Sequence, residues 1–401
     1  MQHFLVFGSH PRLSLAEFRS LKDRLSPPII CGNAAIVQDE DWDGMILMNR
    51  LGGTVKLGDV VGSLSLAELQ PENLVELLSP FLPQRSFDFG MSLFGGGWGA
   101  KNTFQKFPIQ FKKALKAAGH ATRWVSSEQG NELSPAAVAK LKLTTEGLDI
   151  CLLVAGETVF IGKTTDVQDA DAWSLRDYGR PARDDRNGML PPKLARMMVN
   201  LAHVRKGGTF LDPFCGGGTI AMEAALATAA GRIISSDVEN KQVLDTQKNL
   251  HWLIAQRILR PDDADRFQTF RSDARSIAGH LVGKKIDAVA TEGYLGPPLR
   301  GHERAEEIEK TARLIENLWA DSLKELAKIL APTGRIVGIW PAFKTSLGMA
   351  RVDLTPRLAE LGFRLVEPLD GWEQEHGPLL YMRPEQHVAR RIVILELLGR
   401  S

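Results

Sequence analysis

The 401-residue sequence is poor in cysteine, with only Cys31, Cys151 and Cys215, which lie far apart. Neither a CxxC pair nor an HxxxH spacing occurs, so the sequence predicts no zinc site, no other metal site and no disulfide framework. An odd number of widely spaced thiols fits a reducing compartment. We therefore expect a cytoplasmic protein.

Long apolar runs are also absent, because no stretch approaches the roughly 20 residues that a spanning helix needs. The first residues, "MQHFLVFGSHPRLS", have no basic region before their apolar stretch and no cleavage pattern. We expect no membrane association.

An excess of charge of one sign is missing as well, since 49 Lys and Arg residues face 48 Asp and Glu residues. The charge is unevenly placed, however: residues 1–80 carry a net charge of −4, and residues 85–163 a net charge of +4. The middle segment is thus the better candidate for an anionic partner, although a solvated helix face explains a modest excess equally well.

The first 165 residues alternate between short strands and helices. Residues 3–8 are typical of a strand, and a helix should follow with Ser14 as its N-cap and Glu17 closing a capping box. Further on, "FPIQFKKALKAAGH" predicts a helix that ends before Gly119, and a hairpin should bend at Gly156. These patterns predict small α+β units.

The C-terminal half predicts a doubly wound, mostly parallel α/β sheet. Apolar strands and amphipathic helices alternate there. Strands are expected at 209–213, 232–236, 267–271, 286–291, 334–340, 362–366 and 390–396, with helices at 193–204, 219–230, 239–256 and 303–330. The last helix carries one apolar stripe, which we expect to pack on the sheet: Ile308, Ala312, Ile315, Trp319, Leu323, Leu326 and Leu330.

A glycine-rich loop, "LDPFCGGGTI", links the first of these strands to a helix. It lacks the Lys-Ser/Thr pair that follows the last glycine of a Walker A loop, so the pattern does not indicate a nucleoside triphosphatase. The dinucleotide pattern is formally met, but Asp212 ends the strand and would place a carboxylate where a pyrophosphate lies. A carboxylate suits a cationic ligand such as S-adenosylmethionine, while the glycines let backbone amides approach the carboxylate of its methionine part.

Two further acids end the next two strands. Asp237 would accept from ribose hydroxyls, and Asp273 from an adenine amine. Each acid alone could be an ordinary helix N-cap, but three at successive strand ends favour a donor site.

The fourth strand runs into "TEGYLGPPL", where methyltransferases that act on ring or exocyclic nitrogens often carry Asn/Asp/Ser-Pro-Pro-aromatic. Glu292 supplies a hydrogen-bond acceptor and Tyr294 an aromatic face for a flat base, whereas Gly293 stands where proline is usual. Thr291, Glu292, Gly293 and Tyr294 are the candidate catalytic residues. A plain strand-to-helix loop is the alternative.

With these motifs the chain resembles the tRNA guanosine-N2 methyltransferases that modify guanosine 10, in particular bacterial relatives of that archaeal and eukaryotic family. The stretches "RPARDDRNGMLPPK" and "LDPFCGGGTI" carry the resemblance most specifically, with "YMRPEQHVARRIVILE" as the closing strands. The family more often has Asp-Pro-Pro-Tyr at the catalytic position.

The resemblance implies a ferredoxin-like domain at 1–80, a THUMP-like RNA-binding domain at 81–165, a linker at 166–188 and a Rossmann-like, S-adenosylmethionine-dependent methyltransferase domain with a seven-stranded sheet at 189–401. The implied donor-binding residues are Met189, Leu190, Pro191, Lys193, Asp212, Pro213, Gly216, Gly218, Thr219, Asp237 and Asp273. The implied RNA contacts are Lys112, Lys113, Lys116, Arg123, Arg176, Arg180 and Arg183.

We therefore expect a tRNA methyltransferase that modifies the 2-amino group of a guanosine by direct in-line transfer, after the base flips out of its helix. A small activating subunit is compatible with the sequence. Three alternatives stay open: a methyltransferase of ribosomal RNA or DNA amines, a donor-binding RNA-binding protein whose transfer Gly293 impairs, and a nicotinamide dehydrogenase, which Asp212 disfavours.

Overall fold

The computed structural model describes residues 1–22, 25–97, 104–126, 132–183, 189–299, 301, 303–345, 348–372, 377–384 and 386–399. Contacts between Cα atoms divide the chain into two compact units. The first contains Met1–Ser14 and Asp23–Ala172, and the second contains Leu15–Lys22 and Trp173–Ser401. Each unit is built around one large sheet.

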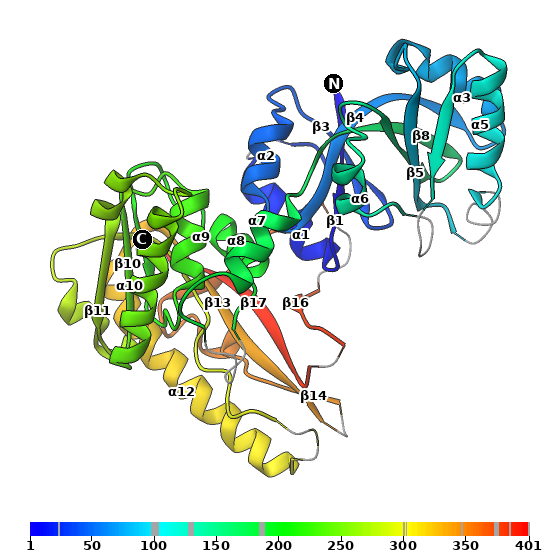
Figure 1. The fold of residues 1–401 in the computed structure, drawn as a ribbon. Helices are drawn as coiled ribbons and strands as arrows, with labels where there is room; N and C mark the ends of the chain where they lie inside the picture. The colour runs from blue at the N-terminus through cyan, green and yellow to red at the C-terminus, as the bar shows by residue number, and fades with distance from the viewer. Residues whose placement is uncertain are drawn as a thin grey trace. The chain divides into compact units, whose positions relative to one another are not determined.

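The first unit holds an eight-stranded sheet in the order β2-β3-β1-β4-β8-β7-β5-β6. Its strands are β1 (Gln2–Phe7), β2 (Ile29–Cys31), β3 (Ala34–Gln38), β4 (Thr54–Ser65), β5 (Phe87–Gly95), β6 (Thr122–Val125), β7 (Leu148–Ala155) and β8 (Thr158–Val167). The helices α2 (Gly44–Arg50), α3 (Pro71–Leu78), α5 (Phe107–Ala117) and α6 (Pro135–Lys140) belong to this unit, and α1 (Pro11–Ser20) begins in it and continues in the second. Figure 1 shows α3 and α5 beside β5, where Leu74, Phe111 and Phe89 share one apolar cluster.

Most of the predicted elements of this part are confirmed. The strand at 3–8 is β1, Gly119 lies just beyond α5 with φ +90°, and Gly156 bends the β7–β8 hairpin. The predicted capping box is wrong, because α1 begins at Pro11 and Ser14 lies inside it. Glu17 is fully buried and accepts a hydrogen bond from Asn200 Nδ2 at 2.7 Å.

Strands from residues 1–80 and from 81–165 share the one sheet, since β4 pairs with β8 along its length. The predicted linker contains the helix α7 (Ala170–Tyr178), in which Trp173 and Arg176 are buried. The division of the chain into four functional segments stays a prediction.

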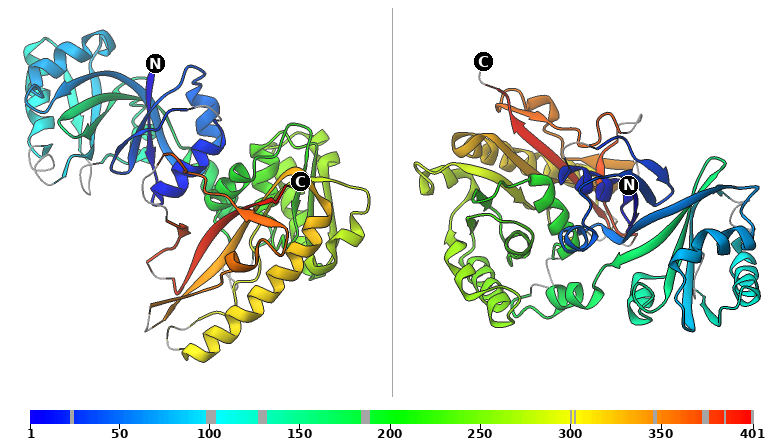
Figure 2. Two further views of the ribbon diagram at one scale, coloured as in Figure 1. Left: turned by 180° about the vertical axis from the view of Figure 1, so that it is seen from behind. Right: turned by 90° about the horizontal axis from the view of Figure 1, so that it is seen from above.

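The second unit holds the predicted α/β sheet, whose main path runs β11-β10-β9-β12-β13-β17-β15. The strands are β9 (Thr209–Asp212), β10 (Arg232–Asp237), β11 (Phe267–Arg271), β12 (Ile286–Thr291), β13 (Leu330–Thr345), β14 (Gly348–Arg351), β15 (Phe363–Leu365), β16 (Leu379–Tyr381) and β17 (Val388–Leu397). Strands β9 to β13 are parallel, and β17 runs antiparallel to β13. Figure 2 shows β13 and β17 side by side. The predicted α/β fold class is confirmed for this unit: seven strands in this order, with a topological switch between β9 and β12, form a Rossmann-like sheet.

Helices cover both faces of this sheet (Figure 1). The helices α8 (Pro192–Ala202), α9 (Thr219–Ala227) and α10 (Asn240–Ala255) precede or follow the first two strands, and α11 (Ile277–His280) and α12 (Ala305–Ile329) come later. Successive residues of β12, Ala288, Val289 and Ala290, are all fully buried, as expected for a strand packed on both sides.

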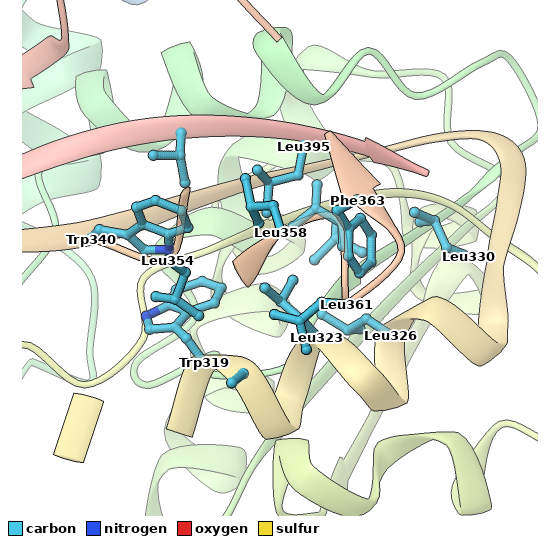
Figure 3. Packing of buried hydrophobic residues seen from close by; sticks show 14 of the residues in the cluster. Trp319, Leu323, Leu326, Leu330, Trp340, Leu354, Leu358, Leu361, Phe363 and Leu395 are labelled. Carbon is cyan, nitrogen blue, oxygen red and sulfur yellow. The ribbon is translucent and has the colours of Figure 1, made fainter. Parts of the chain in front are cut away.

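The apolar stripe predicted for α12 forms the core of the second unit. All seven of its residues belong to one buried cluster, in which Trp319 and Leu323 face residues from β13 and from the segment after β14 (Figure 3). The indole of Trp319 fits against two glycines: a β-carbon on Gly293 would lie 3.1 Å from its Nε1, and one on Gly338 only 2.6 Å from its Cη2. These glycines therefore make room for one of the two fully buried tryptophans of the core.

None of the helices in the described ranges is both long enough and apolar enough to cross a membrane.

The packing of Trp319 predicts that Gly338→Ala destabilises the second unit by about 1–3 kcal/mol, because the added methyl group overlaps the indole. Gly279→Ala in α11 is the matched control, since its β-carbon meets nothing within 4 Å. Urea unfolding followed by tryptophan fluorescence measures both. Equal stability of the two variants would contradict the packing.

Candidate functional site

A cavity of about 880 Å³ opens at the carboxyl ends of β9, β10 and β12. This is the edge where an open parallel sheet binds ligands, at the point where strand order reverses. One side of the cavity is lined by the three predicted acids, Asp212, Asp237 and Asp273. The loop after β12, with Glu292, Gly293 and Tyr294, lines the same cavity.

Asp212 is the most deeply buried of the three acids, with 1% of its surface exposed. Its Oδ1 accepts a hydrogen bond from Thr291 Oγ1 at 2.7 Å and one from the backbone N–H of Phe214 at 3.3 Å. Its Oδ2 has no hydrogen-bond partner among the described residues. Burial raises the pKa of Asp212 to about 7, although these hydrogen bonds favour the ionised form.

Asp237 holds the glycine loop. Its two carboxylate oxygens accept from the backbone N–H groups of Gly216 and Glu239, each at 3.0 Å. Gly218 has φ +79° and precedes the first residue of α9, a conformation that costs glycine least. The loop therefore turns sharply beneath the N-terminal end of α9, where backbone N–H groups lack intrahelical acceptors.

Asp273 caps the short helical turn after β11, since its side chain accepts from Arg275 N–H at 2.9 Å. It also pairs with the Arg275 guanidinium at 2.6 Å, and this pairing lowers its pKa. Both residues line the cavity, so an adenine amine would meet an acid that already has a cationic partner.

These residues fit S-adenosylmethionine, the donor predicted from the sequence. A buried carboxylate oxygen without a partner is costly unless a cationic or hydrogen-bonding ligand satisfies it, and the ammonium of a methionine supplies that group. A β-carbon on Gly216 would meet no atom within 4 Å, so the loop leaves open space beside the cavity.

The acceptor side of the cavity holds an ion pair that sequence reasoning missed. Arg390 Nε, from β17, donates to Glu292 Oε1 at 2.6 Å, and both side chains are largely buried. Burial raises the pKa of Glu292, and the charge of Arg390 opposes that rise. Tyr294 is 55% exposed and lines the cavity, so its ring is available for contact with a flat ligand.

Only some of the predicted donor-binding residues line the cavity. Met189 and Leu190, which precede α8, line it, and so do Pro213 and Thr219 from the glycine loop and the start of α9. Pro191, which precedes the first residue of α8, and Lys193 do not belong to its lining in the described residues. The Nζ atom of Lys193 instead lies 5.9 Å from the ring centre of Trp173.

Two arginines assigned to RNA have structural roles. Arg180 is 3% exposed, and its guanidinium donates to Thr219 Oγ1 and contacts the sulfur of Met189. Arg176 is 8% exposed and pairs with Glu223, which also binds Arg196. These side chains hold the connector on the donor loop and on α9, and their burial disfavours the phosphate contacts expected of both. A buried partner far along the chain has no local sequence signal.

The other cations predicted to contact RNA lie at the surface. Arg183 is exposed and lines the cavity. Lys112, Lys113 and Lys116 are exposed on α5, and Arg123 forms an exposed ion pair with Asp88.

Metal and thiol chemistry find no support in the described part of the chain. No cluster of three or more His, Cys, Asp or Glu residues there is arranged to hold a metal. Burial raises the pKa of Cys215 well above its usual value, so its thiol is a poor nucleophile.

Comparisons with known proteins agree with this geometry. Residues 180–266 match the family described as "RMKL-like, methyltransferase domain". The chain is 38% identical over 110 residues to the tRNA (guanine(10)-N2)-dimethyltransferase of Methanothermobacter thermautotrophicus, a match that covers 27% of this chain and 28% of that one. It is 28% identical over 178 residues to the protein of the same name from Methanocaldococcus jannaschii, covering 43% of this chain and 47% of that one. The chain thus spans less than half the length of these two curated relatives.

Among solved structures, TrmN from Thermus thermophilus has a similar fold, with a TM-score of 0.54, 18% identity and coverage of 99% of this chain and 100% of that one. The resemblance to the tRNA guanosine-N2 methyltransferases predicted from the sequence is confirmed, and within this chain residues 180–266 are similar to the RMKL-like methyltransferase domain.

Proposed function

We propose that this protein is an S-adenosylmethionine-dependent methyltransferase that modifies the 2-amino group of a guanosine in tRNA. One observation carries the proposal: a single cavity joins the unpartnered carboxylate oxygen of Asp212 to the acceptor loop with Glu292 and Tyr294. The curated relatives carry the name of a tRNA guanine-N2 enzyme, which agrees with this assignment.

The donor half of the cavity would hold S-adenosylmethionine, which supplies an electrophilic methyl group. Asp212 would pair with its ammonium, and backbone N–H groups at the start of α9 would face its carboxylate. Asp237 would accept from the ribose hydroxyls, since each of its oxygens still has a lone pair after binding a backbone amide.

The acceptor half would bind the flipped guanine. An exocyclic amine is a weak nucleophile, because its lone pair is delocalised into the ring. Glu292 would accept a hydrogen of this amine and fix its direction, while the exposed ring of Tyr294 would stack on the base. The amine can lose its proton after transfer, so positioning and exclusion of water would contribute most of the rate.

The first unit would bind the tRNA. Its THUMP-like segment, residues 81–165, carries the exposed Lys112, Lys113 and Lys116 on one helix, where they can contact phosphates without reading sequence. Arg183, at the cavity itself, would meet the backbone beside the flipped nucleotide.

Incubation of the protein with labelled donor and bulk tRNA tests the reaction, with nucleosides identified by mass spectrometry. We expect N2-methylguanosine or its dimethyl form. Ribosomal RNA and duplex DNA serve as parallel substrates. A folded protein that binds donor yet methylates none of the three, or only DNA or ribosomal RNA, would contradict the proposal.

Replacement of Asp237 by Ala should weaken donor binding by roughly 10- to 100-fold, because hydrogen bonds to a carboxylate contribute about 1.5–3 kcal/mol. Isothermal calorimetry measures the affinity, and circular dichroism confirms the fold. Asp262→Ala, at an exposed acid outside the cavity, is the control. Unchanged affinity in Asp237→Ala would remove the ribose assignment.

Donor affinity should also depend on pH through Asp212. Because burial raises its pKa to about 7, the carboxyl group is increasingly neutral below that pH and loses its attraction for a cation. Affinity should fall by up to about tenfold per pH unit below pH 7 and level off above it. Calorimetry between about pH 5.5 and 7.5 measures this slope. The isosteric Asp212→Asn variant should bind weakly with a flat profile, and an unchanged slope would assign the dependence to another group.

A further inference from the structure

Strand β17 brings a buried arginine to the acceptor half of the cavity. Arg390 is 5% exposed, and its Nε binds Glu292 Oε1 at 2.6 Å. The two residues are 98 positions apart in the chain, and both line the cavity beside Tyr294. The pair is thus part of the wall that an acceptor base would touch.

Several polar atoms of this pair are left for a ligand. Among the described residues, no other hydrogen bond or ion pair involves the second carboxylate oxygen of Glu292 or the two terminal nitrogens of Arg390. These atoms are also not among the fully buried ones that lack a partner, so they keep accessible surface. Since both residues line the cavity, it presents an acceptor next to a group of donors.

We propose that Arg390 is a specificity-determining residue that, together with Glu292, reads the Watson–Crick edge of the acceptor base. This edge of guanine carries one acceptor, O6, followed by two donors, N1–H and the 2-amino group. A guanidinium beside a carboxylate complements that order. Adenine and 2,6-diaminopurine present a donor at position 6 and an acceptor at N1. The Arg390 guanidinium would then face a donor, and the Glu292 carboxylate would face an acceptor.

The inference rests on the proposed function and gives Arg390 a second, positioning role. Without its partner, Glu292 would be a buried carboxylate with no opposing charge, a state that proteins avoid by protonation. Arg390 lies within a strand, opposite Pro341 on β13 and Tyr381 on β16, so it is held on a rigid element.

The test compares a tRNA transcript with guanosine at the mapped target against one with 2,6-diaminopurine, which keeps the 2-amino group. Wild-type kcat/KM should favour guanosine by at least about 100-fold. The double variant Glu292→Gln/Arg390→Met, which leaves no unpaired buried charge, should reduce this ratio to below about tenfold. Arg390→Lys, which keeps a charged donor, should preserve part of it.

A matched control lies one residue along β17. Side chains alternate between the faces of a strand, and Arg391 lies over the Trp340 ring and pairs with Asp353. Arg391→Lys should therefore keep the wild-type ratio. If a variant shows no turnover, its affinities for the two transcripts, measured in the presence of S-adenosylhomocysteine, give the preference for guanosine over 2,6-diaminopurine instead.

The outcomes separate the two proposals. If wild-type protein forms no methylated guanosine in tRNA, the proposed function fails and the inference with it. If wild type methylates guanosine and the double variant keeps its full preference in rate and in binding, only the role of the Glu292–Arg390 pair is overturned. A ratio that collapses in the Arg391 control would likewise assign selectivity to the strand rather than to Arg390.

Discussion

The hydrogen bond between Thr291 and Asp212 ties together the two strand ends on which the site depends. Strands β9 and β12 are neighbours in the sheet although their ends lie 79 residues apart in sequence. The bond satisfies one oxygen of a carboxyl group that is almost wholly buried and leaves the other without a partner in the described structure. A buried polar atom without a hydrogen bond lowers the stability of a protein and is uncommon in native structures. The free oxygen of Asp212 therefore favours a bound ligand at this point of the crevice.

The acceptor loop shows how a departure from a familiar motif can have a packing cause. Gly293 stands where related sequences more often have proline, and the face of its Cα lies against the indole of Trp319. The same indole lies against Gly338 on the neighbouring strand and near the ring of Phe214 in the donor loop. A large core side chain therefore packs directly beneath the acceptor loop, and this close contact gives the glycine at position 293 a packing reason.

Much of the fold was predictable, because the seven main strands of the second sheet and the helices α8, α9, α10 and α12 have local signals, whereas the short elements α7, α11, β14 and β16 were not predicted. Apolar runs, the stripe on α12 and the glycine loop after β9 are patterns of residues that are close in sequence. The three acids could be predicted because each follows the end of a predicted strand. The unpredicted contacts of the site depend on partners distant in sequence: Arg180 on Thr219, Arg176 on Glu223, and Arg390 on Glu292. An arginine in a polar segment has the same local pattern whether it is solvated or buried against a carboxylate. The error with Ser14 has a similar origin, since tertiary contacts of α1 outweigh its capping pattern.

The size of the cavity constrains how an RNA would be chosen. A volume of about 880 Å³ is in the range of sites for one or two small ligands, enough for a donor and a single base but far too small for a folded RNA. The proposed role of the Glu292–Arg390 pair would therefore distinguish one base from another but not one RNA from another. Under the proposed function, recognition of tRNA would come from surfaces outside the cavity, and phosphate contacts by exposed lysines such as those on α5 would add affinity without sequence information. In the proposed reaction, selection by RNA shape in one unit and by base edge in the other would be two independent requirements, so a guanosine would be modified only when both are met.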